Sequence, residues 1–148
     1  MGGWERCRGV DVQCEGKGGV MAKMNQLTVH CENRPGTLAH ICRTLGDAKV
    51  NVLGFLATTS NSEGAVHLVV DNVNNAKKTL LDTGLSYTEV DVLHLELPNV
   101  PGALGQFAGK LAAKDINTTL GYQTSAKGSR KASVVPAVSD LEQAARVR

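Results

Sequence analysis

The chain has 148 residues, of which 42% are apolar, and a formal net charge of +2 at pH 7. This length suits one ordinary domain or two very small ones. The nearly balanced charge gives no electrostatic reason to expect nucleic acid or an anionic membrane as a partner, and five aromatic residues are too few for a base-stacking surface. No apolar run approaches the roughly 18 residues that a membrane-spanning helix needs.

The cysteines predict a reducing environment. They are Cys7, Cys14, Cys31 and Cys42, they form no Cys-x-x-Cys pair, and no histidine follows at a zinc-like spacing. Cys31 and Cys42 fall on positions expected in the core. A reduced cytoplasmic protein, without a metal or another cofactor, is the simplest interpretation.

Residues 1–20 differ from the rest because repeated glycines break every periodicity. Glycine loses the most entropy when it is ordered, so such a composition resists folding. We predict that 1–24 is a disordered extension and that the functional chain starts at Met21 or Met24. The alternative is that Val10, Val12 and Cys14 alternate as an edge strand.

From Leu27 onward, hydrophobic periodicity predicts regular elements. Alternation marks the strands, and apolar residues at helical spacing mark the helices, with Leu38, Ile41, Cys42 and Leu45 on one face. The expected elements are strand 27–32, helix 37–49, strands 50–59 and 65–70, helix 73–82 with Ala76, Leu80 and Leu81 inward, and strand 85–90. The order β-α-β-β-α-β predicts a ferredoxin-like α+β fold with an antiparallel sheet.

The turn Asn33-Arg34-Pro35-Gly36-Thr37-Leu38 returns as Asn99-Val100-Pro101-Gly102-Ala103-Leu104, 66 residues later. At the same offset the apolar helix positions coincide, Asn117 falls on Asn51, and Val135 falls on Val69. Agreement over strand, turn and helix indicates an internal repeat. The second copy is expected to contain strand 93–97, a helix after Gly102, strands 116–124 and 131–135, and a helix from about 139.

The second copy ends before a fourth strand, which would leave one edge of its sheet uncovered. We interpret it as a truncated module. The alternatives are that the N-terminal stretch or another chain completes the sheet. The predicted domains are therefore 25–91 and 92–148.

The stretch from Cys31 to Leu38, with Lys49-Val50-Asn51-Val52 after it, resembles the signature of ACT domains. These domains are found in phosphoglycerate dehydrogenase and in the regulatory subunit of acetolactate synthase. The second copy, Leu97 to Leu104 and then Asp115-Ile116-Asn117, fits more loosely. The whole is similar to stand-alone proteins that consist of two tandem ACT domains and have no catalytic domain.

The resemblance implies a small amino acid as ligand, in a cleft between two ACT modules. The first-turn amides after Gly36 and Gly102 are suited to an α-carboxylate, and asparagine offers both a donor and an acceptor to a zwitterion. A purely structural role is the alternative, because glycine and asparagine also serve tight turns. The candidate ligand-binding residues are Asn33, Pro35, Gly36, Thr37, Leu38, Asn51, Asn99, Gly102, Ala103, Leu104 and Asn117.

One position departs from the family pattern. Where the dehydrogenase has a ligand-contacting histidine, this chain has Cys31 in the first copy and Leu97 in the second. The resemblance therefore does not imply serine as the ligand. His30 and His67 are expected to point away from the helices, but no carboxylate or thiol accompanies them at the fixed spacing of a metal site.

The sequence thus predicts a non-catalytic regulatory protein that binds a small amino acid or a related metabolite at ACT–ACT interfaces. We expect a homodimer, with an enzyme of amino-acid metabolism as a further partner. The alternative is a structural or interaction subunit that pairs with such an enzyme without binding a ligand. No activated nucleophile, carboxylate pair or nucleotide loop suggests an enzyme.

Overall fold

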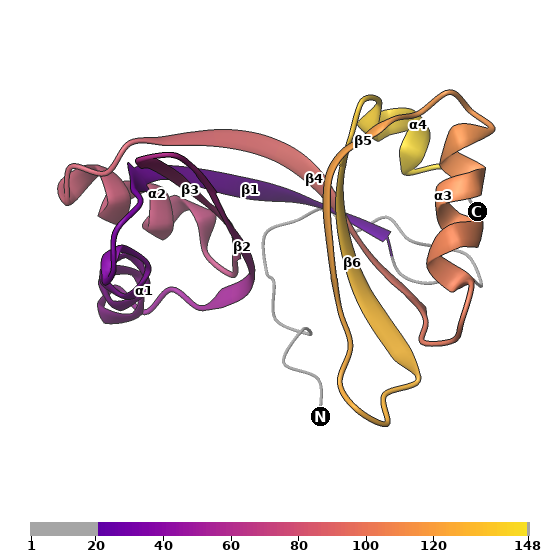
Figure 1. The fold of residues 1–148 in the computed structure, drawn as a ribbon, viewed down its shortest axis with the longest axis horizontal. Helices are drawn as coiled ribbons and strands as arrows, with labels where there is room; N and C mark the ends of the chain where they lie inside the picture. Colours follow the sequence, from indigo (N-terminus) through magenta and orange to yellow (C-terminus); the bar gives the residue numbers. More distant parts are fainter. Residues whose placement is uncertain (1–20, 148) are drawn as a thin grey trace. The chain divides into compact units, whose positions relative to one another are not determined.

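A computed structural model describes residues 21–147 (Figure 1). The predicted extension falls mostly on residues 1–20, outside the described part, and so does the alternative strand from Val10 to Cys14. No helix among the described residues is long and apolar enough to cross a membrane. The elements are β1 (Met21–Glu32), α1 (Thr37–Asp47), β2 (Val52–Ser60), β3 (Glu63–Val70), α2 (Val73–Asp82), β4 (Tyr87–Pro98), α3 (Ala103–Ala112), β5 (Thr118–Thr124), β6 (Lys131–Val138) and α4 (Leu141–Ala144).

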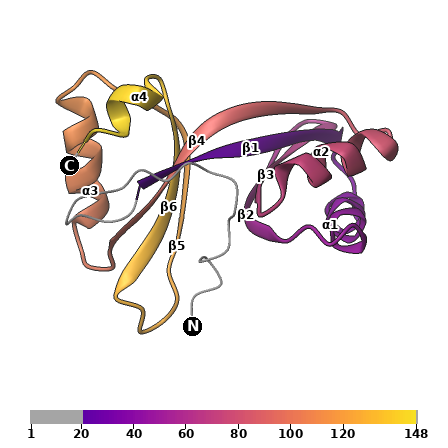
Figure 2. The ribbon, with the colours of Figure 1, turned by 180° about the vertical axis from the view of Figure 1, so that it is seen from behind.

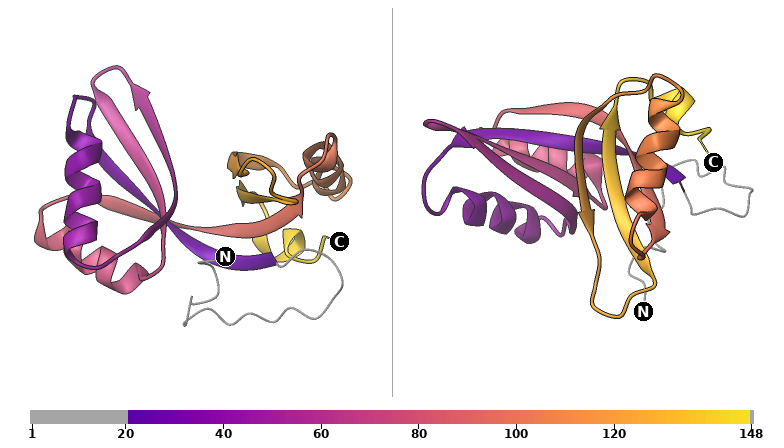
Figure 3. Two further views of the ribbon diagram at one scale, coloured as in Figure 1. Left: turned by 90° about the horizontal axis from the view of Figure 1, so that it is seen from below. Right: turned by 45° about the vertical axis from the view of Figure 1, so that its right-hand side comes forward.

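Two compact units divide the described chain. The first module is Asn25–Val90, and the second module combines residues 21–24 with residues 91–147. Hydrogen-bonded neighbours follow the order β2-β3-β1-β4-β6-β5, and β1 and β4 run side by side (Figure 3). Each module therefore has the four-strand order and the two helices of a ferredoxin-like fold, as the sequence predicted for the first module, whereas the second was predicted to lack its last strand.

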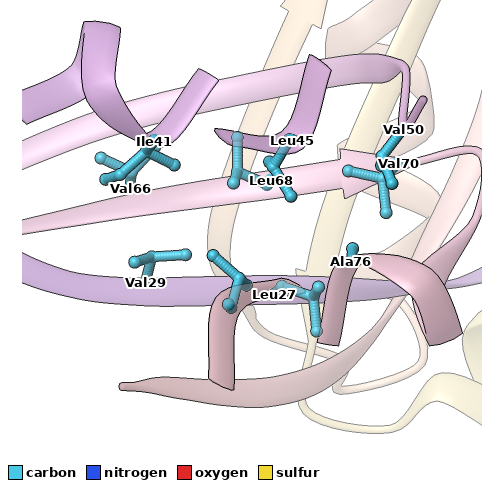
Figure 4. Close-up of a cluster of buried hydrophobic side chains, with 10 residues drawn as sticks. Leu27, Val29, Ile41, Leu45, Val50, Val66, Leu68, Val70 and Ala76 are labelled. Atoms are coloured by element: carbon cyan, nitrogen blue, oxygen red, sulfur yellow. The ribbon is translucent and has the colours of Figure 1, made fainter. Parts of the chain in front are cut away.

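The first module buries one face of its sheet under α1 and α2. Leu27, Val29, Val66 and Leu68 from the strands meet Ile41 and Leu45 of α1 and Ala76 and Leu80 of α2 (Figure 4). The period-2 alternation of β1 and the i, i+4 spacing in both helices produce these faces. At roughly 1.5 to 3 kcal/mol for each large apolar side chain that is fully buried, this core is the main source of the module's stability.

Three helix positions predicted to face the core are exposed instead. Leu38 and Cys42 lie on the outer side of α1, and Leu81 lies on the outer side of α2 with 64% of its surface accessible. The same happens in α3, where Leu104 and Ala108 are exposed while Phe107 and Leu111 are buried. A helix packed against a single sheet buries a stripe narrower than the apolar pattern suggested.

The second module packs α3 and α4 against its own sheet (Figure 2). Its core contains Leu93 and Leu95 of β4, Val134 of β6, Phe107 and Leu111 of α3, and Ala144 of α4. Met21, at the start of β1, packs against the same cluster. Lys23 of β1 also forms an ion pair with Glu142 of α4.

The start of β1 therefore fills the position expected to be empty in the second module. Within that module the strand order is β5-β6-β4-β1, so residues 21–24 stand where a fourth strand belongs. Of the possibilities weighed from the sequence, the N-terminal stretch completes the sheet. Residues 21–24 are strand, four residues earlier than the predicted module boundary.

The strand register in β6 differs from the one expected from the 66-residue offset of the repeat. Leu95 pairs with Val134, and its counterpart Val29 pairs with Val66. Val135 consequently corresponds to His67, not to Val69, because the loop 125–130 is longer than the loop Asn61–Ser62. The register shift between Val52 and Gly54 is repeated between Thr118 and Leu120, so this irregularity belongs to both modules.

Candidate functional site

Each helix-opening turn has a glycine in the left-handed region. Gly36 has φ 92° and ψ −17°, and Gly102 has φ 88° and ψ −14°. A side chain at such an angle is strained, so glycine is the residue that this backbone requires. Neither helix has a side-chain N-cap. In the first module the Thr37 N–H donates to the Arg34 carbonyl at 3.3 Å, and Ala103 makes the same bond to Val100 in the second.

These two turns leave backbone donors for a ligand. The first N–H groups of any helix have no acceptor within it, and they lie at the positive end of the helix dipole. In α1 the Leu38 and Ala39 amides are such groups, and in α3 the Leu104 and Gly105 amides are. No atom beyond the chain neighbours lies within 4 Å of where a Cβ on Gly36 or Gly102 would be. The turns are therefore open for an anion to approach.

The side chains nearest the turns differ in character. Pro35 is exposed, and Thr37 and Ala103 are half-buried at the first helical position. Leu38 is 36% exposed and Leu104 is 46% exposed, both large apolar groups beside an open turn. An apolar part of a ligand or of a partner could pack on them.

Asn33 and Asn99 bind backbone carbonyls of their own module. The Asn33 Nδ2 atom donates to the Asn61 carbonyl at 3.0 Å, and the Asn99 Nδ2 atom donates to the Ser129 carbonyl at 2.9 Å. Both acceptors lie in the loop of the neighbouring hairpin. These asparagines are next to the glycine turns, as predicted, but one donor of each amide group is already used.

Asn51 and Asn117 lie at the other end of each module. Between Gly36 and Asn51 runs the 11-residue helix α1, which spans about 16 Å at 1.5 Å per residue. The Asn51 N–H donates to the Asp71 carboxylate, and the Asn117 N–H donates to the Ser139 hydroxyl. A module therefore does not bring its own Asn51 or Asn117 to its own glycine turn. The resemblance implied a cleft between two modules for these residues.

Cys31 and Leu97 occupy equivalent places. Both are partly buried against the core of their module. The Cys31 sulfur lies 3.3 Å from where a Cβ on Gly64 would be, so glycine at 64 leaves room for the thiol. Cys31 faces the core as predicted, whereas the other expected core cysteine, Cys42, is exposed. Neither position offers a polar group like the histidine of the dehydrogenase.

A small cluster of polar side chains lies on the face of each sheet away from the helices. The sequence indicated these two clusters only in part. In the first module the Thr28 hydroxyl lies 3.0 Å from Nδ1 of His67, and Thr28 and Gln26 are buried. In the second, His94 Nε2 lies 2.6 Å from the Ser133 hydroxyl. Burial lowers the pKa of both histidines, with His30 lowering that of His67 further and Glu96 partly opposing the effect at His94. Sequence periodicity gave the side of the sheet but not the hydroxyl partners.

Neither of these polar clusters forms a metal site. Nowhere in the part of the chain that the structure describes do three His, Cys, Asp or Glu residues gather as they would around a metal ion. Tyr122 lies on the same face in the second module, and burial raises its pKa to about 12. A phenol with so high a pKa stays neutral at physiological pH.

Comparison with known proteins agrees with the geometry. Residues 25–80 match the family model of the ACT domain, and this segment is an ACT domain. No curated protein matches the sequence. The solved structure of protein BT0572 from Bacteroides thetaiotaomicron is similar over 84% of this chain and 85% of that one, with 26% identity and a TM-score of 0.79.

Two further structures share the two-module fold. The regulatory subunit of aspartate kinase from Thermus thermophilus, in a ligand-free form, has a TM-score of 0.69 and 15% identity over 88% of this chain and 94% of that one. The corresponding subunit from Thermus flavus has a TM-score of 0.59 and 14% identity, over 87% and 92%. This chain therefore folds as two ferredoxin-like modules, and the first of them contains the segment that matches the ACT domain.

Proposed function

We propose that the protein is a non-catalytic regulator that binds a small amino acid, or a related metabolite, through the glycine turns of its ACT modules. The repeated turn carries this proposal: Gly36 and Gly102 have the same left-handed backbone, each opens a helix, and the space where a Cβ would lie is open at both. An α-carboxylate suits the first-turn amides, because both their hydrogen bonds and the helix dipole favour an anion.

The remainder of the site requires a second module. Because Asn51 is about 16 Å from Gly36 along α1, an amino acid that uses both must lie between two modules. We propose that these come from two copies of the chain in a homodimer. The asparagine side chain would then meet the α-amino group while the glycine turn of the other copy holds the carboxylate.

The similar structures indicate the class of partner. Two of them are regulatory subunits of aspartate kinase, so we propose an enzyme of amino-acid metabolism as the regulated partner. The free thiols of Cys31 and Cys42 fit a reducing compartment, and we place the protein in the cytoplasm.

The second candidate is an interaction subunit that pairs with such an enzyme without a ligand. The exposure of Leu38 and Leu104 favours it, because each is a large apolar side chain at the protein surface. On this alternative the turns are structural, and the two leucines contact the enzyme directly.

A thermal-shift screen of the twenty amino acids separates the two functions. A ligand that binds only the folded protein at about 100 times its Kd adds roughly 2.7 kcal/mol to the free energy of unfolding, so the melting temperature must rise. The Gly36→Val variant should lose the rise if the first module holds the carboxylate, and the Gly102→Val variant if the second does. No rise with any amino acid at millimolar concentration would favour the interaction subunit.

A further inference from the structure

The asparagine that precedes each glycine turn makes the same two bonds in both modules. The Asn33 N–H donates to the Ser62 carbonyl at 2.9 Å, beside the bond from its side chain to Asn61. The Asn99 N–H donates to the Arg130 carbonyl at 2.9 Å, beside the bond from its side chain to Ser129. One residue thus holds two successive carbonyls at the tip of the hairpin next to it.

The hairpin tips themselves have little in common. The first is the loop Asn61–Ser62, where Asn61 has φ 55°. The second is the longer loop 125–130, where Gly128 has φ 80° and the Ser129 hydroxyl donates to the Lys131 carbonyl at 2.7 Å. The two loops thus differ in length, sequence and internal hydrogen bonds. We therefore attribute the shared hydrogen bonds to the asparagine, which is the same residue in both modules.

We propose that Asn33 and Asn99 are positioning residues that link each glycine turn to the tip of the adjacent hairpin, in place of direct contacts to a ligand through Nδ2. This proposal rests on the proposed function. A carboxylate bound to the Leu38 and Ala39 amides restricts the motion of the turn. The hydrogen bonds of Asn33 transmit this restriction to Asn61 and Ser62. The mobility of the hairpin tip then depends on whether a carboxylate is bound at the turn. By thermodynamic linkage, a partner that holds the tip raises the affinity of the turn for the carboxylate.

Hydrogen exchange of the full chain tests the link. The Asn33→Asp variant keeps the size of the side chain but removes the N–H donor. Losing one hydrogen bond should raise the exchange of amides 61–64 about three- to tenfold without any added amino acid. The Arg34→Ala variant is the matched control, because the Arg34 side chain forms an exposed ion pair with Glu32 and its removal should leave the hairpin unchanged. The Asn99→Asp variant should act in the same way on amides 128–131.

A mixture of the twenty amino acids, each at millimolar concentration, tests the coupling. In the wild-type chain the mixture should slow exchange at Leu38 and Ala39 and also at 61–64. In Asn33→Asp it should still slow exchange at Leu38 and Ala39 but no longer at 61–64. Loss of all protection by the mixture, with an unchanged hairpin in its absence, would make Asn33 a ligand contact and overturn the proposal.

The outcomes also separate this proposal from the proposed function. If the mixture protects no amide of the wild-type chain, amino-acid binding and the coupling both fail. The exchange of amides 61–64 in Asn33→Asp then still decides whether the asparagine holds the tip. If those amides exchange at the wild-type rate, the link itself is wrong.

Discussion

The two modules keep the same backbone at their glycine turns but differ in several of the side chains around it. Gly36 and Gly102 agree within a few degrees in φ and ψ. Around the first turn, Glu32 and Arg34 form an exposed ion pair, whereas the second has Pro98 and Val100 in their places. The amides that suit a carboxylate are thus common to both turns, and any difference in preference for the rest of a ligand must come from the flanking side chains.

The modules also differ in how they complete their sheets. The first uses four strands from one continuous stretch, Asn25–Val90. The second takes its last strand from the first residues of β1, so its parts lie far apart in the sequence. The same fold is therefore reached by one local and one non-local route, and the second includes residues 21–24, which lie outside the first.

Removing residues 21–24 should have the largest effect. A chain that starts at Asn25 loses the packing of Met21, the Lys23–Glu142 ion pair and a row of strand bonds. We expect the free energy of unfolding of the second module to fall by on the order of 3 kcal/mol, as measured by hydrogen exchange of α3 and β6.

The matched control is a chain that starts at Met21, which should retain the stability of both modules. Exchange in β3 and α2 of the first module should change little in either chain. Equal loss of protection in both modules would show that the first also depends on residues 21–24.

The glycine turns should give the next largest effect. Gly36→Ala and Gly102→Ala place a Cβ at a left-handed angle, and each should cost about 1 to 2 kcal/mol in urea unfolding. Gly46→Ala, in α1 without a positive φ and with open space around it, is the matched control and should stabilise by up to about 1 kcal/mol. If Gly36→Ala stabilised as well, the left-handed turn would be wrong.

Loss of a helix N-cap should have a smaller effect on stability, and each module has one side-chain cap to test. The Asn72 side chain caps α2 by accepting from the Asn75 N–H, and Asp140 caps α4 by accepting from Gln143. Replacing either residue by alanine should cost about 1 kcal/mol, whereas Asn72→Ser and Asp140→Asn should retain most of the stability. Because α4 has only four residues, amide exchange in Asp140→Ala should rise over the whole helix, and a rise limited to its first turn would contradict this.

The smallest effect concerns pH. Burial holds the pKa of His94 below its usual 6.5, so the unfolded chain binds this proton more readily than the folded one. The second module should lose stability as the pH falls through about 6.5. NMR titration should give His94 a pKa below 6.5, and Glu96→Gln should lower that pKa further, because the Glu96 carboxylate raises it. A midpoint above 6.5 would contradict the burial of the ring.

The sequence predicted the local features of this fold and missed the non-local ones. Periodicity located α2 at its observed bounds, 73–82, and the repeat identified both glycine turns. It divided β4 into two strands at Asp91, because nothing local shows that one strand serves two modules. The sequence offered the N-terminal stretch only as an alternative for the missing strand and did not identify residues 21–24, since strand pairing across the chain has no local signal.

The candidate site was predicted in the same uneven way. The left-handed glycines follow from the residue type, because few other residues tolerate that backbone. The bonds of Asn33 and Asn99 could not be predicted, since their acceptors are backbone carbonyls and carry no sequence signature. Leu38 and Leu104 were assigned to the core because helical periodicity marks apolar residues without showing how wide the buried stripe is.

The most direct test of the account is an NMR titration of ¹⁵N-labelled full chain with the mixture of amino acids. We expect saturable shifts of the Leu38 and Ala39 amides, or of the Leu104 and Gly105 amides, that Gly36→Val or Gly102→Val abolishes in its own module. Saturable shifts that leave all four of these amides unmoved would contradict the carboxylate site at the glycine turns.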